Sequence, residues 1–428
     1  MERYKEYRDS GVQWIGEIPS HWDVIKLNHL FSHNTGKTLN SNLTGNSLPY
    51  LTTSNVYNGY FDLSNVKEMP FLEEEIERYT IKYGDLLVCE GGDIGRCNIW
   101  KENYTICYQN HLHRLRPKTN LDVDYYSFLI NLFKSLGVFE NFGKGIAIKG
   151  LSANALGNTR LLYPPLAEQE KIVSYLDSKT SKIDSYVADK EKEILLLQEL
   201  KQKTIADAVT KGLNPNVKMK DSGISWLGMI PEHWETKRIA SLFTGKVKAN
   251  TDFEYHHAFK FYYGTLVPKE ETGDIEEYRD TYVKYSVLQK DDIMINGLNL
   301  NYDFISQRVA IAPSDGIITS AYVVARPRKG TNAQYYNYLF KTMDNMKLFH
   351  GMGTGIRLTL SFDELKKQLV VVPPQEEQRA IVAYIEEKCQ KIDTLITELQ
   401  AEIDYLKEYK QRLIADVVTG QVNVQNEI

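Results

Sequence analysis

Two long stretches of the chain carry the spacing of apolar and polar residues that is typical of an α-helix. Residues 166–210 and 375–419 contain no proline and no glycine and are rich in Lys, Glu, Leu, Ile and Ala. A Pro-Pro pair precedes each stretch and a glycine follows it, as expected at helix ends. Each stretch predicts a helix of ~45 residues, about 65 Å long at ~1.5 Å per residue.

An exposed single helix of that length is not expected to be stable, so we predict that the two helices pack on each other as a coiled coil. Apolar residues of the second helix alternate in steps of four and three, the spacing of a coiled-coil seam. Lys410 occupies one position of this seam, and Lys190 and Lys201 interrupt the looser seam of the first helix. The predicted helix–helix packing residues are Ile183, Val187, Ile194 and Leu197 in the first helix and Ile392, Ile396, Leu399, Ile403, Leu406, Leu413 and Val417 in the second.

The remaining sequence has the pattern of mixed α/β domains. Short apolar or alternating runs, separated by Gly, Asn and Asp turns, predict strands at 81–89, 293–295, 317–324 and 368–372. Helical spacing is present at 125–136 and 335–346. The predicted fold class is therefore α/β (α+β) domains in tandem, each followed by a long helix, with the two helices paired as an antiparallel coiled coil of pseudo-twofold symmetry.

The chain is an internal duplication. Residues 9–31 and 221–243 are identical at 11 of 23 positions, and both contain Trp-x-Gly-x-Ile-Pro-x-His-Trp. Residues 164–210 and 373–419 are identical at 22 of 47 positions, from Pro-Pro-x-x-Glu-Gln to Ile-Ala-Asp. The segments between these blocks share only scattered anchors. One frame carrying two diverged interiors suggests one architecture that presents two different recognition surfaces.

The repeat divides the chain into four predicted domains. They are a first recognition domain at 1–163, a first helical region at 164–212, a second recognition domain at 213–372, and a second helical region with a short tail at 373–428.

Composition places the chain among ordinary globular proteins, with 428 residues, 42% hydrophobic residues and a net charge of −5. No stretch approaches the ~20 apolar residues of a membrane helix, and the first residues lack the apolar core of a secretory signal. The four cysteines show no Cys-x-x-Cys spacing, which predicts unpaired thiols and no zinc site. The expected location is the cytoplasm.

Catalytic motifs are missing from the sequence. Gly36-Lys37-Thr38 resembles the end of a phosphate-binding loop, but Phe31 stands where the first glycine is required. The two Pro-Pro pairs lack the Asn or Asp of an adenine methyltransferase motif. We expect the histidines of the repeated Ile-Pro-x-His-Trp block to form hydrogen bonds rather than to catalyse, and we predict that the chain alone is not an enzyme, with no cofactor or metal of its own.

Candidate DNA contacts are polar or basic residues near glycine-rich turns, where the backbone can approach phosphates and base edges. The loops 143–150 and 351–357 stand out, because each copy places a basic residue there. The candidates are Lys37, Thr52, Ser54, Asn55, Arg96, Lys144 and Lys149 in the first half and Lys246, Lys248, Lys260, Tyr262, Tyr263, Asn299, Asn301 and Arg357 in the second.

The doubled Trp-x-Gly-x-Ile-Pro-x-His-Trp, Pro-Pro-x-x-Glu-Gln and Ile-Ala-Asp motifs resemble the specificity subunit of type I restriction–modification systems over essentially the whole chain. The resemblance implies two target-recognition domains that each recognise half of a bipartite, asymmetric site in double-stranded DNA. It also implies helices that set the spacer and dock two methylase subunits. S-adenosylmethionine would belong to these partners, and ATP and Mg²⁺ to motor-nuclease subunits. Two alternatives are a coiled-coil scaffold that does not contact DNA and an enzyme with an unrecognised site.

Overall fold

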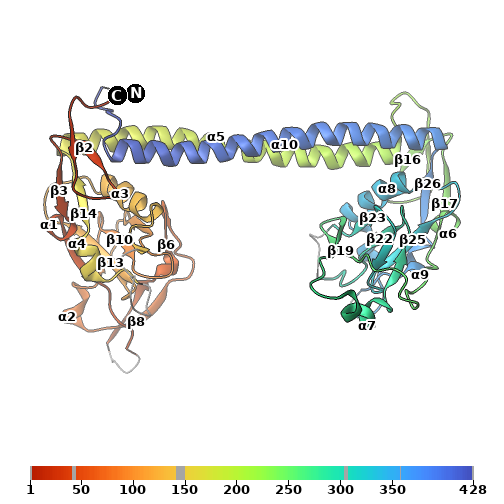
Figure 1. The fold of residues 1–428 in the computed structure, drawn as a ribbon, viewed down its shortest axis with the longest axis horizontal. Helices are drawn as coiled ribbons and strands as arrows, with labels where there is room; N and C mark the ends of the chain where they lie inside the picture. Colours follow the sequence, from red (N-terminus) through yellow and green to blue (C-terminus); the bar gives the residue numbers. More distant parts are fainter. Residues whose placement is uncertain (1, 41–44, 141–149, 303–306, 357, 427–428) are drawn as a thin grey trace. The chain divides into compact units, whose positions relative to one another are not determined.

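The computed structural model describes residues 2–40, 45–140, 150–302, 307–356 and 358–426 (Figure 1). The chain divides into two compact units. Unit 1 comprises Met1–Lys190 and Ala401–Ile428, and unit 2 comprises Glu191–Gln400. Each unit therefore combines one mixed α/β module with one part of each long helix, α5 (Leu166–Lys211) and α10 (Gln375–Val418).

The module of unit 1 contains two four-stranded sheets and three strand pairs. The sheets have the orders β11-β10-β13-β4 and β8-β5-β12-β9, and the pairs are β1-β2, β14-β3 and β6-β7. The helices are α1 (Leu27–Leu30), α2 (Glu73–Ile76), α3 (Val123–Ser135) and α4 (Ala153–Asn158). The strands are β1 (Tyr7–Asp9), β2 (Glu17–Pro19), β3 (Asp23–Lys26), β4 (Phe31–Thr35), β5 (Asn46–Leu51), β6 (Val56–Tyr57), β7 (Tyr60–Phe61), β8 (Lys67–Phe71), β9 (Thr80–Ile81), β10 (Leu86–Cys89), β11 (Cys97–Ile99), β12 (Ile106–Tyr108), β13 (Leu112–Pro117) and β14 (Arg160–Tyr163).

Unit 2 repeats this frame with a different interior. Its four-stranded sheet has the order β18-β25-β22-β23, and the pairs are β15-β16, β17-β26, β19-β20 and β21-β24. The helices are α6 (Ile239–Leu242), α7 (Arg279–Tyr282), α8 (Ala333–Asn345) and α9 (Phe362–Leu365). The strands are β15 (Met219–Asp221), β16 (Met229–Pro231), β17 (Glu235–Arg238), β18 (Phe243–Thr244), β19 (Phe259–Tyr262), β20 (Thr265–Pro268), β21 (Ser286–Leu288), β22 (Ile293–Ile295), β23 (Val309–Ile311), β24 (Gly316–Ile318), β25 (Val323–Pro327) and β26 (Leu369–Val372).

The predicted elements agree with the structure for the long helices and for the helices α3 and α8, within about two residues at each end, the usual uncertainty of helix boundaries. The strand predicted at 81–89 is wrong, because β9 ends at Ile81 and a turn closed by the Asp85 N–H on the Lys82 carbonyl precedes β10. The single strand predicted at 317–324 is also wrong. It is two strands, β24 and β25, because a turn closed by the Tyr322 N–H on the Thr319 carbonyl separates them. The turn falls on Ser320, Ala321 and Tyr322, between β-branched residues, and no Gly or Pro marks it in the sequence.

The core of each unit is completed by a long helix that is distant in sequence. In unit 1, Trp22 and the aromatic face of α3 pack with Leu413 and Val417 near the end of α10. In unit 2, Trp234 and the aromatic face of α8 pack with Ala208 and Val209 near the end of α5. Equivalent tyrosines seal both contacts, because the Tyr125 hydroxyl donates to the Val418 carbonyl at 3.0 Å and that of Tyr335 to the Val209 carbonyl at 2.7 Å.

The long helices are joined by ion pairs within each unit. In unit 1, Lys410 Nζ lies 2.6 Å from Asp184 Oδ1, and Lys190 Nζ lies 3.1 Å from Glu402 Oε2. In unit 2, Lys201 Nζ lies 2.6 Å from Asp393 Oδ1. The predicted packing residues of both helices are all buried or half-buried, whereas Tyr186, Leu200 and Tyr405 are exposed.

The four cysteines, Cys89, Cys97, Cys107 and Cys389, are buried and unpaired, as predicted. Burial raises the pKa of each thiol. This keeps the thiols protonated and lowers their reactivity.

Candidate nucleic-acid interface

The repeated His-Trp block anchors each module to the start of a long helix. In unit 1, His21 Nε2 donates to Glu168 Oε1 at 2.7 Å and Trp22 Nε1 donates to Glu168 Oε2 at 3.0 Å. In unit 2, His233 and Trp234 make the same two bonds to Glu377, at 2.5 and 2.9 Å. This glutamate belongs to the Pro-Pro-x-x-Glu-Gln motif, so the two repeated motifs bind each other where the module meets the helix. We call this contact the joint. The predicted hydrogen-bonding role of these histidines is confirmed.

The glutamine of the same motif caps the joint. Gln169 and Gln378 are buried, and each donates through Nε2 to the carbonyl of the first proline of its Pro-Pro pair at 2.8 Å. The Pro-Pro pairs therefore mark the start of each long helix, and this hydrogen bond fixes the backbone between the module and the helix.

Among the candidate DNA contacts of unit 1, Lys37 is 5% exposed and its ammonium is held by Glu75. The ammonium also lies 5.0 Å from the centre of the Phe71 ring. This candidate is corrected: a buried, paired lysine supports the fold and is not available to a DNA phosphate. Its neighbour Gly36 is required because a side chain there would collide with the backbone of Gln109.

Three further candidates of unit 1 form one capped turn. The Asn55 Oδ1 accepts from the Thr52 N–H at 2.8 Å and from the Thr52 hydroxyl, and its Nδ2 donates to the Asp62 carbonyl. Asn55 is buried and shapes the turn, whereas Ser54 is exposed at its surface. Arg96 braces the same turn, because its Nη2 donates to the Thr53 carbonyl at 2.5 Å and its guanidinium stacks over the Tyr57 ring.

Unit 2 presents more of its candidates to solvent. Lys246, Lys248, Lys260, Tyr262, Tyr263 and Asn299 are exposed, and Asn301 is half-buried. The candidates Lys144, Lys149 and Arg357 lie outside the described residues, as does most of the predicted loop 143–150. Sequence reasoning missed Tyr302, and it did not name Ile356 although it singled out the loop 351–357. Both are among the most exposed large apolar residues that the structure describes. The sequence feature that could have identified them is a large apolar residue within a loop rich in glycine and asparagine.

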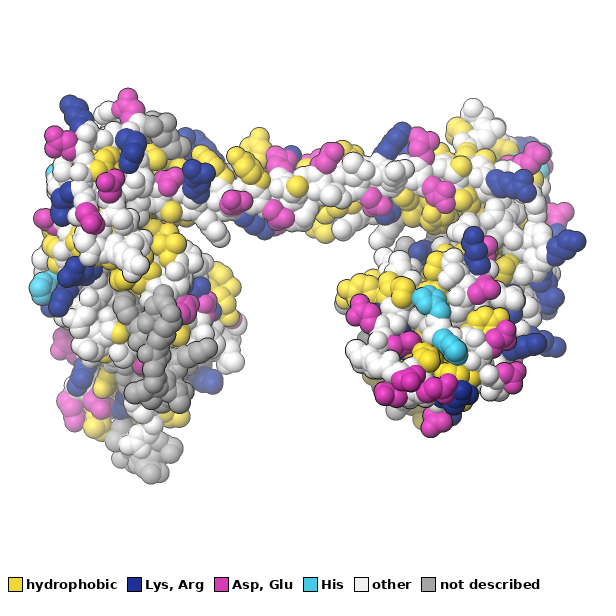
Figure 2. All heavy atoms as spheres, viewed as in Figure 1, with side chains coloured by type: hydrophobic (Ala, Val, Ile, Leu, Met, Phe, Trp, Pro, Cys, Tyr) yellow, Lys and Arg dark blue, Asp and Glu magenta, His cyan; other side chains and the backbone are white. Residues whose placement is uncertain are grey.

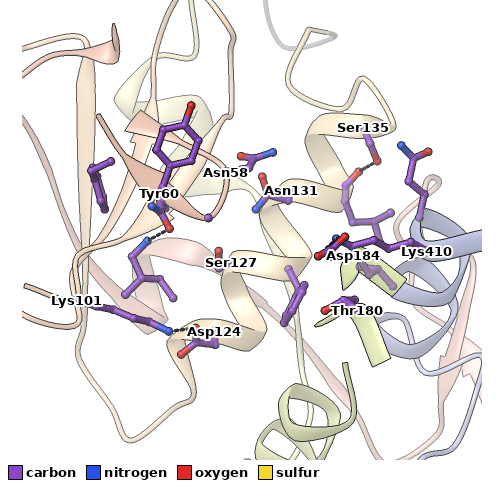
Figure 3. A pocket seen from close by; sticks show the side chains of 18 of the residues that line it. Asn58, Tyr60, Lys101, Asp124, Ser127, Asn131, Ser135, Thr180, Asp184 and Lys410 are labelled. Carbon is purple, nitrogen blue, oxygen red and sulfur yellow. Dashed lines mark hydrogen bonds and ion pairs between the residues drawn. The ribbon is translucent and has the colours of Figure 1, made fainter. Parts of the chain in front are cut away.

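A cavity of about 770 Å³ in unit 1 lies between α3 and the long helices (Figure 3). Its lining mixes polar and apolar residues, and four of its charged side chains form two ion pairs: Lys101 with Asp124 at 2.7 Å and Lys410 with Asp184 at 2.6 Å. A smaller cavity of about 630 Å³ occupies the equivalent place in unit 2, where Lys201 pairs with Asp393. Both cavities mark the seam between module and helices. The part of the chain that the structure describes holds no group of three or more His, Cys, Asp or Glu residues that could bind a metal ion.

Other proteins are similar to this chain of two modules and two long helices. The family model for the type I restriction modification DNA specificity domain matches twice, at residues 19–196 and 231–405. The chain belongs to this family. A putative type I restriction enzyme MjaX specificity subunit from Methanocaldococcus jannaschii is 23% identical over 99% of both chains. The EcoBI specificity subunit from Escherichia coli is 23% identical over 98% of this chain and 90% of its own length.

Solved structures of the family share the fold. The HsdS subunit from Thermoanaerobacter tengcongensis matches 95% of this chain and 98% of its own length, with a TM-score of 0.55 and 16% identity. A chain from a study of complex assembly and conformational transition of the type I R-M system matches 95% of this chain and 99% of its own, with a TM-score of 0.69 and 15% identity. The chain is a specificity subunit, and its function is DNA sequence specificity. No helix among the described residues is long and apolar enough to cross a membrane.

Proposed function

We propose that unit 1 and unit 2 each recognise one half of a bipartite, asymmetric site in double-stranded DNA. The observation that carries this proposal is the contrast between the frame and the interior of the two modules. The His-Trp joint, the β3-β14 and β17-β26 pairs, and the tyrosine contacts to the helix ends are the same in both. The loops and sheets beyond them differ, so the two half-sites differ as well.

We further propose that α5 and α10 form an antiparallel coiled coil with pseudo-twofold symmetry, which sets the spacer between the half-sites. The ion pairs support this arrangement. Lys410 pairs with Asp184 and Glu402 with Lys190, so residue numbers rise along one helix as they fall along the other. Four residues added within 187–204 lengthen one helix by ~6 Å, roughly two base pairs.

The outer surface of the helices supports the docking of two methylase subunits. The seam of α10 follows a heptad repeat, whose positions are named a to g. With Leu406 at d and Lys410 at a, Tyr405 lies at c and Tyr409 at g, on one side of the seam. Tyr186 is a g position of the other helix, on the same side of an antiparallel pair. The repeat offset of 209 residues relates these tyrosines to Leu395, Leu196 and Leu200 in unit 2, and all six are exposed. Two equivalent apolar faces suit two copies of one partner.

The catalytic steps belong to partner subunits in this proposal. The methylase subunits bind S-adenosylmethionine and methylate adenine, and motor-nuclease subunits use ATP and Mg²⁺. The chain contributes specificity. Its net charge of −5 fits a DNA reader that is held in place by its partners better than one that binds DNA alone.

Methylome sequencing of a host that expresses this chain with its neighbouring methylase tests the proposal. The expected result is a split adenine-methylation motif with two unlike halves and a fixed gap. Exchange of residues 38–142 for the same segment of a relative should change one half alone, and the matched exchange of 250–350 should change the other. If either exchange altered both halves, the assignment of one half-site to each unit would be wrong. A stable methylase complex without DNA binding would instead support a scaffold.

A further inference from the structure

The surface of unit 2 carries a group of exposed apolar side chains on three loops. The loops are the β19-β20 turn (262–265), the segment after β22 (296–302) and the described residues 354–356 and 358. Figure 2 shows hydrophobic side chains gathered at the edge of unit 2 where Figure 1 places β19. The exposed fractions are 58% for Tyr262, 72% for Tyr263, 77% for Tyr302 and 96% for Ile356. An apolar group of this kind on a monomer surface marks an interaction site.

Hydrogen bonds join two of the three loops of this apolar patch. Asn301 Nδ2 donates to the Ile356 carbonyl at 3.4 Å, and the Leu300 N–H donates to the Leu358 carbonyl at 3.2 Å. On the other side, a Cβ at Gly264 would lie 2.5 Å from Gln307 Oε1, so the β19-β20 turn approaches the start of β23 closely. Two of the three loops are therefore joined by hydrogen bonds, and the β19-β20 turn approaches Gln307, the residue before Arg308.

A buried arginine shapes the central loop. Arg308 is 1% exposed, and its Nη1 donates to the carbonyls of Asn296 at 3.0 Å and Leu298 at 2.8 Å. The backbone N–H of Arg308 donates to Asp344 Oδ2 at 2.6 Å. Arg308 is a positioning residue, because it fixes the backbone from which Asn299 and Tyr302 project and does not itself reach the surface.

Backbone strain accompanies the exposed side chains. Tyr263, Asn299 and Leu358 have φ values of +43°, +52° and +43°. Tyrosine and leucine rarely adopt this region, where glycine is favoured and asparagine is tolerated, and such strain concentrates at binding sites. Tyr263 lies at a turn position that favours glycine, so placing its ring in solvent costs conformational energy. Folding of the turn does not require a tyrosine there.

A lysine and an amide that can contact DNA accompany the apolar side chains. The described residues of the three loops include no Asp or Glu. Lys260 is exposed and lies two residues before Tyr262, on the same face of β19, where its ammonium can meet a phosphate. Asn299 supplies an amide that can hydrogen-bond a base edge.

We propose that unit 2 recognises its half-site in part through apolar contact between this patch and the methyl groups of thymine in the major groove. The proposal rests on the proposed function, because it names the chemistry by which this unit contacts its half-site. The thymine methyl group is the apolar feature of the major groove, and tyrosine and isoleucine side chains are suited to cover it.

The test uses the chain in complex with its methylase and a duplex that carries the methylated motif. Each thymine of the second half-site is replaced in turn by deoxyuridine, which removes only the methyl group. For the unmodified chain, at least one replacement should weaken binding about four-fold. This is the loss of affinity expected when one buried methyl group is removed. Replacements in the first half-site, as an internal control, report on unit 1 alone.

Variants at Tyr263 distinguish apolar contact from hydrogen bonding. Tyr263→Phe keeps the ring and should keep both affinity and the deoxyuridine effect. Tyr263→Gly keeps the backbone conformation, removes the ring, and should reduce affinity and diminish the deoxyuridine effect. Tyr83→Ala, an exposed tyrosine of unit 1, is the matched control and should change neither.

Specific results would overturn the proposal. They are an unmodified chain that binds thymine and deoxyuridine duplexes equally, or a Tyr263→Phe variant that loses affinity as Tyr263→Gly does. In either case the motif would still be bound, so the proposed function would stand. Loss of all motif-specific binding by the unmodified complex would instead contradict the proposed function itself.

Discussion

At the residue scale, the repeated motifs owe their form to one glutamate in each unit. Glu168 and Glu377 each accept hydrogen bonds from a histidine and from a buried tryptophan, and Glu168 accepts a third from the Tyr4 hydroxyl at 3.0 Å. A carboxylate satisfies both donors at once, which neither water nor a neutral side chain of that size does as well. The tryptophan ring lies close to a glycine just beyond the end of the other long helix, and a side chain at Gly212 or Gly420 would crowd Trp234 or Trp22.

Loss of one such glutamate should destabilise its own unit. Glu377→Ala leaves the indole N–H of buried Trp234 without its acceptor, and should lower the free energy of unfolding of unit 2 by about 1–3 kcal/mol. Glu377→Gln retains one acceptor oxygen and should lose less. Denaturant unfolding or hydrogen exchange of unit 2 measures the change. Glu376→Ala, at the exposed neighbouring position, is the control, and an equal loss there would contradict this role.

A pair of histidines in unit 1 should make its stability depend on pH. His113 Nε2 lies 2.7 Å from the Leu151 carbonyl and therefore donates, so neutral His113 accepts through Nδ1 from His33 Nε2 at 3.1 Å. Burial, with His113 nearby, lowers the pKa of His33 to about 4, and burial also lowers the pKa of His113. Because these folded-state pKa values lie below the ordinary value, the stabilisation is present above about pH 6.5 and is lost as pH falls toward 4.

Thermal unfolding of unit 1 followed between pH 7 and 4 measures this loss. His33→Gln can still donate to His113 but does not titrate, so it should make the decline with pH shallower. His29→Gln, an exposed histidine of the same unit, should leave the decline unchanged. Identical pH profiles for His33→Gln and the unmodified chain would show that other groups cause the decline.

At the element scale, the lysines in the helix seams have partners at equivalent positions. Lys201 and Lys410 are related by the repeat, as are Asp393 and Asp184, and each lysine meets the aspartate of the other helix at 2.6 Å. The aliphatic part of a seam lysine covers apolar surface while its ammonium reaches the rim. A polar seam position of this kind specifies register at some cost in stability.

A double-mutant cycle on Asp184→Asn and Lys410→Met should show a small coupling energy, below about 1 kcal/mol, that decreases with added salt, because Asp184 is exposed. Lys410→Met alone should be neutral or stabilising, since an apolar side chain suits the seam. Asp189→Asn combined with Lys410→Met is the control and should be additive. Chemical denaturation measures each variant, and a coupling of several kcal/mol would mean that the pair is effectively buried.

At the scale of the whole molecule, duplication has produced two equivalent but chemically different apolar faces. The face of unit 1 consists of tyrosines (Tyr186, Tyr405 and Tyr409), and that of unit 2 of leucines (Leu395, Leu196 and Leu200). Tyrosine adds a hydroxyl and a flat ring to the contact, whereas leucine offers aliphatic surface alone. Two copies of one partner should therefore bind with unequal affinity.

Native mass spectrometry of the chain titrated with methylase should show a complex with one methylase before the complex with two. Tyr405→Lys and Leu200→Lys each place a charge in one face and should reduce the stoichiometry from two methylases to one; together they should abolish binding. Glu408→Lys, on the outward face of α10, should leave it at two. Two bound methylases in the double variant would exclude these faces as the docking surfaces.

The sequence alone determined the parts of this protein that depend on local pattern and on the repeat. The long helices follow from seam spacing without Pro or Gly, and the two modules follow from blocks that occur twice. The role of Lys37, the split of residues 317–324 and the patch around Tyr263 were decided by tertiary structure. Lys37 looks like any lysine after a glycine until the fold places Glu75 beside it. Residues 301 and 356 meet only because loops distant in sequence converge, with Asn301 donating to the Ile356 carbonyl. Local spacing determines helices and strands because their hydrogen bonds and side-chain faces repeat over a few residues. A surface assembled from several loops depends on contacts between distant residues, which local spacing does not encode.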